Sequence, residues 1–168
     1  MRNISIVSFV LMTIMITGCS HYRFGNPVPK ESRAVAVTVF ENGTMQPEAE
    51  ALLTQAVCRE FIREGSMKLT DADKAAVIVT GRVIEYSQKP ARYSRQDTDI
   101  PVEYHVRLGA SITVTERQSG KVLLEPLVLT VDTTSLARGD LPTAKRDALH
   151  RAVQALGGRI VQSVIDIW

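Results

Sequence analysis

The chain has 168 residues, with 20 lysines and arginines against 18 aspartates and glutamates, and a net charge of +2 at pH 7. This near balance excludes nucleic-acid binding by bulk charge, which requires a strongly basic domain. The length suffices for one domain with a hydrophobic core rather than for two.

Residues 1–18 have the features of a signal peptide. Arg2 supplies a positive start, and the mostly apolar run 4–16 is too short to span a bilayer. The sequence Ile16-Thr17-Gly18-Cys19 that follows resembles a bacterial lipobox. We therefore expect cleavage before Cys19, diacylation of its thiol and acylation of the new amine. Several acyl chains anchor a protein durably. By resemblance to the sorting rule of Gram-negative lipoproteins, Ser20 rather than Asp after the lipidated cysteine favours the outer membrane over retention at the inner one.

The mature chain is expected to carry a tether at 19–32 and a single domain at 33–168. Pro27 and Pro29 favour an extended tether. If Cys19 carries lipid, Cys58 is the remaining thiol and an intramolecular disulfide is excluded. Cys58 is then expected to be a small, partly buried apolar residue rather than a reactive one.

The first half of the domain predicts a strand and a helix. Residues 33–40 alternate valines with smaller residues, which is typical of a strand. Residues 41–44, Glu-Asn-Gly-Thr, predict a turn with Asn and Gly in left-handed conformations. Residues 47–64 carry apolar side chains at helical spacing, and Gly65 is a plausible stop.

The second half predicts three strands and a closing helix. The expected elements are a strand at 75–86, a polar loop at 87–99, a strand at 102–115, a hairpin turn at 118–120, a strand at 121–133 and a helix from 140 onward. Pro126 places the third of these strands at an edge or a bulge. Gly157 and Gly158 predict either close packing of the helix against the sheet or a break into two helices.

The element order β-α-β-β-β-α predicts an α+β fold. In this fold, two helices pack on one face of a four-stranded, mostly antiparallel sheet. In the strand at 102–115, one face is expected to be core and carries Val102, Tyr104, Val106, Leu108, Ala110, Ile112 and Val114.

No catalytic or metal-binding motif stands out in the sequence. His21, His105 and His150 lie far apart and lack ligand-pair spacing. Neither a nucleophile elbow nor a phosphate loop is present. We therefore expect a protein that is not an enzyme and has no cofactor or metal. Asn42-Gly43-Thr44 matches a glycosylation sequon, but we expect Asn42 to stabilise the turn rather than to carry a glycan.

Five basic residues form the candidate binding set. They are Lys89, Arg92 and Arg95 in the loop 87–99, and Arg117 and Lys121 beside the hairpin turn. Their side chains suit phosphates, Arg through bidentate hydrogen bonds and Lys as a point charge. The alternative is a solvated loop with Asp97 and Asp99 as counter-charges.

Several segments together resemble the lipopolysaccharide-assembly lipoprotein family, LptE. The resemblance rests on Thr17-Gly18-Cys19, the strand and turn 35–44, the helix 50–62, Val79-Thr80-Gly81-Arg82-Val83 with Tyr86, the run 115–123 and the closing helix that ends in Trp168. It covers nearly all of the mature chain and keeps the element order. Family members often have Cys-Gly-Tyr after the cleavage site, where this chain has Cys19-Ser20-His21-Tyr22.

The resemblance implies a non-enzymatic protein anchored by its lipid in the Gram-negative outer membrane and facing the periplasm. Proteins similar to this one plug the large β-barrel LptD, assist its assembly and contact lipopolysaccharide on its way to the outer leaflet. The five basic residues are then candidate contacts for lipopolysaccharide.

An alternative is a lipoprotein regulator of a periplasmic peptidoglycan synthase. Such domains also start with a strand, a turn and an amphipathic helix. They commonly need a long tether to cross the periplasm. Here about a dozen residues, at roughly 3.5 Å each, separate Cys19 from the first strand, which favours the plug.

Overall fold

The computed structural model describes residues 33–94, 101–136 and 141–167. Its elements are β1 (Ala34–Val37), β2 (Glu41–Asn42), α2 (Ala49–Glu64), β3 (Lys68–Leu69), β4 (Val77–Tyr93), β5 (Pro101–Glu116), β6 (Val122–Leu136) and α3 (Leu141–Asp166). The expected signal peptide, Cys19, the tether and Arg95 lie outside the described residues.

The strands form one mixed, six-stranded sheet. Its order is β3-β1-β4-β5-β6, and β2 pairs with β4 beyond the end of β1. The pairings of β1 with β3, of β1 with β4 and of β2 with β4 are parallel, whereas β4, β5 and β6 pair antiparallel. The α+β class and the two helices are confirmed, but the prediction of four mostly antiparallel strands was wrong. Strands β2 and β3 have two residues each and are too short to show a periodicity.

Strand β4 is longer than its sequence indicated. It continues to Tyr93 and takes in half of the predicted loop 87–99. This extension is polar, so its own sequence does not mark it as a strand. It pairs with β5 as far as Tyr93, which lies opposite Pro101, and this pairing overrides the local preference.

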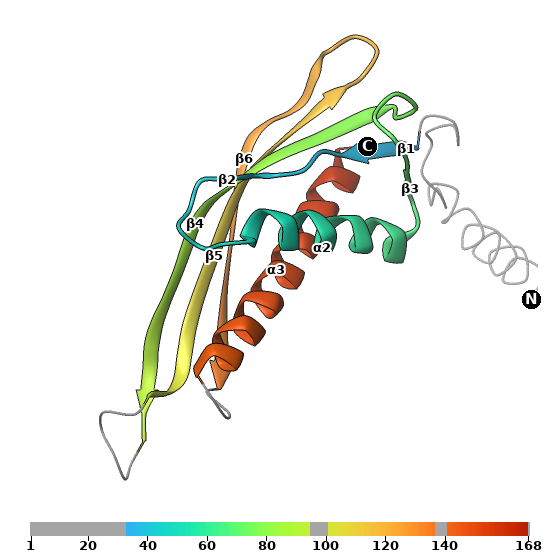
Figure 1. Ribbon diagram of the computed structural model, residues 1–168. Coiled ribbons are helices and arrows are strands. Elements are labelled where there is room, and N and C mark those ends of the chain that lie inside the picture. Colours follow the sequence, from blue (N-terminus) through green and yellow to red (C-terminus); the bar gives the residue numbers. More distant parts are fainter. Residues whose placement is uncertain (1–32, 95–100, 137–140, 168) are drawn as a thin grey trace, which may run out of the picture.

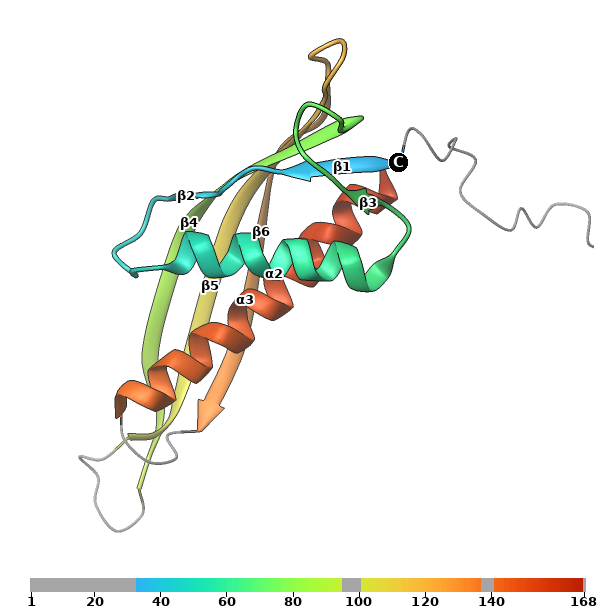
Figure 2. The same ribbon diagram turned by 45° about the vertical axis from the view of Figure 1, so that its right-hand side comes forward.

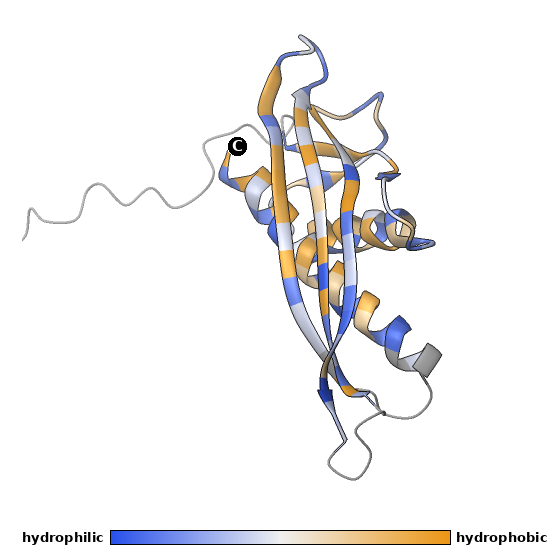
Figure 3. Cartoon of the chain, turned by 90° about the vertical axis from the view of Figure 1, so that its left-hand side faces the viewer, coloured by the Kyte–Doolittle hydropathy of each residue, from blue (hydrophilic) through white to orange (hydrophobic). Residues whose placement is uncertain are grey.

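Both helices cover the same face of the sheet, which we call the inner face (Figure 1 and Figure 3). The predicted alternation of β5 is confirmed from Tyr104 onward, because Tyr104, Val106, Leu108, Ala110, Ile112 and Val114 are buried, whereas Val102 is only half buried. The helices add large buried side chains, among them Leu53 and Phe61 of α2 and Leu156 and Ile160 of α3. These residues make one core between the helices and the sheet.

The turn after β2 is built on Asn42, the last residue of that strand. The first half of the turn predicted at 41–44 is therefore strand, because Glu41 and Asn42 pair with β4. The Asn42 side-chain oxygen accepts hydrogen bonds from the backbone N–H and the hydroxyl of Thr44, both at 2.9 Å, and its amide donates to the Gln46 carbonyl at 2.8 Å. The interpretation of Asn42 as turn chemistry is therefore supported. The left-handed residue before α2 is Glu48 (φ 63°), and neither Asn42 nor Gly43 adopts that conformation. Gly65 ends α2 with φ 78°, as predicted.

Helix α3 runs unbroken through Gly157 and crosses α2 there (Figure 2). A Cβ atom on Gly157 would lie 3.2 Å from the Cβ of Ala56 and 3.3 Å from the backbone nitrogen of Val57. Of the two alternatives for the glycine pair, the helix break is wrong. The glycine does permit close packing, but against α2 rather than against the sheet.

Substituting Gly157 with Leu is therefore expected to destabilise the fold by about 1–3 kcal/mol, because the side chain has no room at the helix crossing. Gly158 is the matched control, since a Cβ there meets only the Glu60 Oε1 at 3.7 Å. Gly158→Ala should raise the free energy of unfolding by up to about 1 kcal/mol through helix propensity. Urea denaturation measures both, and equal stability of Gly157→Leu and the wild type would contradict the packing argument.

Candidate functional site

The outer face of the sheet, turned away from both helices, is mainly polar, with Val128 and Leu136 of β6 as exposed apolar side chains. In Figure 3 the three long strands lie in front of the helices, and no described element covers them. The side chains that alternate with the buried ones include Thr80, Arg82, Glu85, Ser87, Lys89, Glu103, His105, Arg107, Ser111, Thr113, Thr130, Asp132 and Thr134. The alternation of strand residues thus separates a core face from a hydrophilic one.

The charges on this outer face are largely paired. The Asp132 carboxylate accepts hydrogen bonds from Arg107 Nε at 2.8 Å and Nη2 at 3.3 Å, and His105 Nε2 lies 3.1 Å away. Arg92 Nε lies 3.3 Å from Glu103 Oε2. The hydrogen bonds from Arg107 hold the pKa of Asp132 below its usual range. The outer face is therefore a surface of mixed charge rather than a basic patch.

The predicted basic residues are not brought together. Lys89 of β4 lies opposite His105 of β5 in the strand register, toward one end of the sheet. Arg117 and Lys121 lie at the β5–β6 hairpin, at the other end (Figure 1). At a strand rise of about 3.3 Å per residue, the 12 positions from His105 to Arg117 put the two groups roughly 40 Å apart. One small anionic group cannot contact both.

Their local roles also differ. Arg117 Nε donates to the Ala75 carbonyl at 2.7 Å and ties the hairpin to the start of β4, so this side chain has a structural role. Arg92 is paired with Glu103. Lys89 and Lys121 are exposed, and within the described part of the chain no ion pair is found for either.

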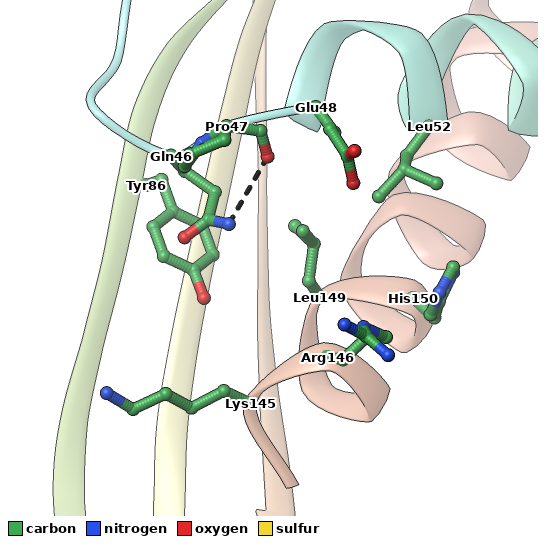
Figure 4. Close-up of a pocket in the computed structure, with 9 residues that line it drawn as sticks. All are labelled: Gln46, Pro47, Glu48, Leu52, Tyr86, Lys145, Arg146, Leu149 and His150. Carbon is green, nitrogen blue, oxygen red and sulfur yellow. Dashed lines mark hydrogen bonds between the residues drawn. The ribbon is translucent and has the colours of Figure 1, made fainter. Parts of the chain in front are cut away.

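A pocket of about 280 Å³ lies on the helix side of the molecule, between the start of α2, the start of α3 and β4 (Figure 4). It is lined by Gln46, Pro47, Glu48, Leu52, Tyr86, Lys145, Arg146, Leu149 and His150. Helix α3 therefore contributes the cations of Lys145 and Arg146 and the imidazole of His150. The residue before α2, Glu48, contributes one carboxylate. Leu52 and Leu149 supply apolar surface between them.

One further feature favours anionic groups in this pocket. The first turn of α2 has no side-chain cap at Glu48, so its N-terminal amides add partial positive charge. Tyr86 adds no free donor, because its hydroxyl, whose pKa is raised by burial, already donates to Gln88 Oε1 at 3.3 Å. The combination of cations and apolar surface suits an anion that carries a hydrophobic portion.

Lys145, Arg146 and His150 were not predicted to be binding residues. The available signal was the spacing of Arg146 and His150 by four residues, with Lys145 beside them, which places a basic stripe on one side of a helix. Tyr86 joins them only through the packing of α3 against the sheet. Nothing in its local sequence indicates that contact.

Cys58 is half buried, and burial raises the pKa of its thiol, which disfavours the reactive thiolate. Among residues 33–94, 101–136 and 141–167, no group of three or more His, Cys, Asp or Glu is placed to hold a metal ion. Across the same residues, no helix combines the length and apolarity needed to cross a membrane.

The network at Asp132 gives a direct test. Arg107→Gln is expected to raise the pKa of Asp132 toward its usual value of about 3.9, since the main stabilising partner of the carboxylate is removed. Because the folded-state pKa is depressed, the contribution to stability is present at neutral pH and is lost as pH falls through that depressed pKa. Carboxyl titration by NMR measures the shift. Arg82→Gln, on the same face but paired with Glu41 at 3.9 Å, should leave Asp132 unchanged.

Comparison with solved structures supports the fold. Protein XCC0632 from Xanthomonas campestris aligns with a TM-score of 0.62 at 14% identity, covering 87% of this chain and 91% of that one. The hypothetical protein CT253 from Chlamydia trachomatis aligns with a TM-score of 0.53 at 12% identity, covering 78% and 94% respectively. At these identities the likeness concerns the fold alone.

A search of curated proteins finds no match. The family model LptE, described as "Lipopolysaccharide-assembly", matches residues 32–164. That range covers all the described strands and nearly all of α3. The chain therefore belongs to the lipopolysaccharide-assembly family LptE.

Proposed function

We propose that this protein is a lipoprotein of the outer membrane that plugs an LptD-like β-barrel, assists its assembly and takes part in moving lipopolysaccharide to the outer leaflet. It is anchored through lipid on Cys19, faces the periplasm and catalyses no reaction. The observation that carries the proposal is the LptE family match over residues 32–164.

The shape of the sheet supports a position inside a lumen. Strands β4, β5 and β6 have 17, 16 and 15 residues, so each extends about 50 Å at the usual rise per residue. The body that they form is long and narrow in both ribbon views (Figures 1 and 2). Such a body can reach through the full height of a membrane barrel.

The polarity of the outer face supports the same position. The lumen of a membrane β-barrel is polar, in contrast to its lipid-facing surface. An outer face whose charges are largely paired, as Arg107 with Asp132 and Arg92 with Glu103, can lie against such a wall with little unpaired charge to bury.

Contact with lipopolysaccharide requires cations for its phosphates. Of the five basic residues predicted from the sequence, Lys89 and Lys121 keep exposed side chains with no ion pair in the described part of the chain. The pocket adds Lys145 and Arg146 beside apolar Leu52 and Leu149. We assign the pocket to a phosphate together with the start of an acyl chain, because a charge-assisted hydrogen bond and apolar contact are both available there.

The partner is tested by affinity purification of the tagged protein from its own outer membrane in mild detergent, followed by mass spectrometry. We expect a large β-barrel at close to one copy per copy of this chain. Recovery of a peptidoglycan synthase would favour the regulator alternative, and recovery of no stable partner would contradict the plug.

The lipopolysaccharide contact is tested with Lys145→Gln/Arg146→Gln. Losing two charge-assisted hydrogen bonds, at about 1.5–3 kcal/mol each, should weaken binding of purified lipopolysaccharide at least tenfold. The difference from the wild type should shrink at high salt, because exposed charges are screened.

The matched control is Lys68→Gln/Lys74→Gln, which removes the same net charge from exposed residues outside the pocket. Equal loss in both variants would reduce the effect to net charge. Lys89→Gln/Lys121→Gln, measured in the same assay, tests the two exposed lysines that the sequence predicted.

A further inference from the structure

Strand β6 leaves a long edge of the sheet open. It is the last strand in the sheet order, and among the described residues it pairs with β5 only. From Leu127, opposite Ile112, to Leu136, opposite Glu103, the pairing runs without a register shift. Ten residues therefore have regular strand geometry along an unpaired edge.

One hydrogen bond fixes which residues face outward. Arg159 Nη1 of α3 donates to the backbone carbonyl of Thr130 at 2.7 Å, so this carbonyl points away from β5. Because backbone groups alternate along a strand, those of Val128, Asp132, Thr134 and Leu136 point the same way. The close side-chain contact of Asp132 with Arg107 agrees, since opposing residues approach most closely in pairs that do not exchange hydrogen bonds.

The composition of this edge favours pairing with another strand. Residues 127–136, Leu-Val-Leu-Thr-Val-Asp-Thr-Thr-Ser-Leu, contain no proline or glycine and a single charge, which Arg107 pairs. Exposed edges of this kind add strands readily unless something blocks them. Val128 is 58% exposed and Leu136 is 43% exposed, so apolar side chains flank the open backbone groups.

We propose that the edge at Val128–Thr134 pairs antiparallel with the same edge of a second copy of this chain, and that Arg159 restrains the pairing. A two-fold axis between identical edges makes each copy donor and acceptor to the other. The inference goes beyond the proposed function and does not depend on it.

The charges select the register. Placing Asp132 opposite its own copy sets like charges against each other, which is unfavourable. A shift that places Thr130 opposite Asp132 of the second copy moves the two Asp132 side chains from opposite to diagonal positions, which weakens this repulsion. It also sets Val128 opposite Thr134 and diagonal to Leu136, so the exposed apolar side chains cover each other.

The surroundings of the edge leave room for the added strand. A hollow of about 460 Å³ lies beside Thr134 and Leu136, with Asp147 and Arg151 of α3 on its other side. Arg159 is the obstacle, because its guanidinium occupies the hydrogen-bonding position at Thr130. Pairing requires this side chain to turn away.

The test uses the full chain in mild detergent and measures protein mass by light scattering across a range of concentrations. The wild type should show a concentration-dependent dimer. Arg159→Ala, which frees the Thr130 carbonyl, should dimerise about fivefold more tightly or better. Thr134→Pro removes an outward N–H that β5 does not use, so it should keep the fold and lose the dimer. Thr134→Ala, which keeps that N–H, should behave as the wild type.

Two results would overturn the proposal: monomers of both the wild type and Arg159→Ala at all concentrations, or a dimer that persists in a folded Thr134→Pro variant. Should Thr134→Pro fail to fold, amide hydrogen exchange on the wild type decides, since the Asp132 and Thr134 amides must exchange more slowly as the concentration rises. Slow exchange of these amides only in the presence of a barrel would assign the edge to the barrel and refute self-pairing. The outcome is independent of the barrel purification.

Discussion

The close crossing of α2 and α3 is the contact on which the rest of the molecule depends. Because Gly157 has no side chain, the two helices approach so closely that a Cβ atom there would lie 3.2 Å from Ala56 and 3.3 Å from the backbone nitrogen of Val57. Both helices can then lie on one face of the sheet and share one core with it. A wider crossing would lift one helix off the strands and leave buried residues such as Leu156 and Ile160 without partners.

Both helices cover the same face of the sheet, so its other face needs to be compatible with solvent or with a partner. Three strands of 15 to 17 residues with helices on one face leave the other face to solvent or to a partner. Polar side chains and paired charges, such as Arg107 with Asp132, keep that face compatible with water. The same features let it lie against a polar wall, so one surface serves the free protein and the proposed complex.

The sequence predicts an element of this structure only where its pattern of polar and apolar residues is long enough to show a period. Strand β5 was predicted with its faces correct because its alternation is long, whereas β2 and β3 give no pattern and exist only through pairing with neighbours. The polar part of β4 was predicted to be a loop because its pairing with β5 is not local. The same limit applies to the site, since Arg117 contacts Ala75 only after folding, and Tyr86 and Lys145 come to line one pocket only then.

Pro126 lies where the pairing of β6 with β5 changes register. Between the pairs Ile112–Leu127 and Thr115–Val122, β6 uses two more residues than β5. The hairpin end of β6 therefore pairs with β5 in a different register from the part that faces the helices. Residues could be gained or lost in the hairpin without moving Leu127, Leu129 or Val131 from the inner face. The reach of this hairpin can thus vary between relatives while the core stays the same.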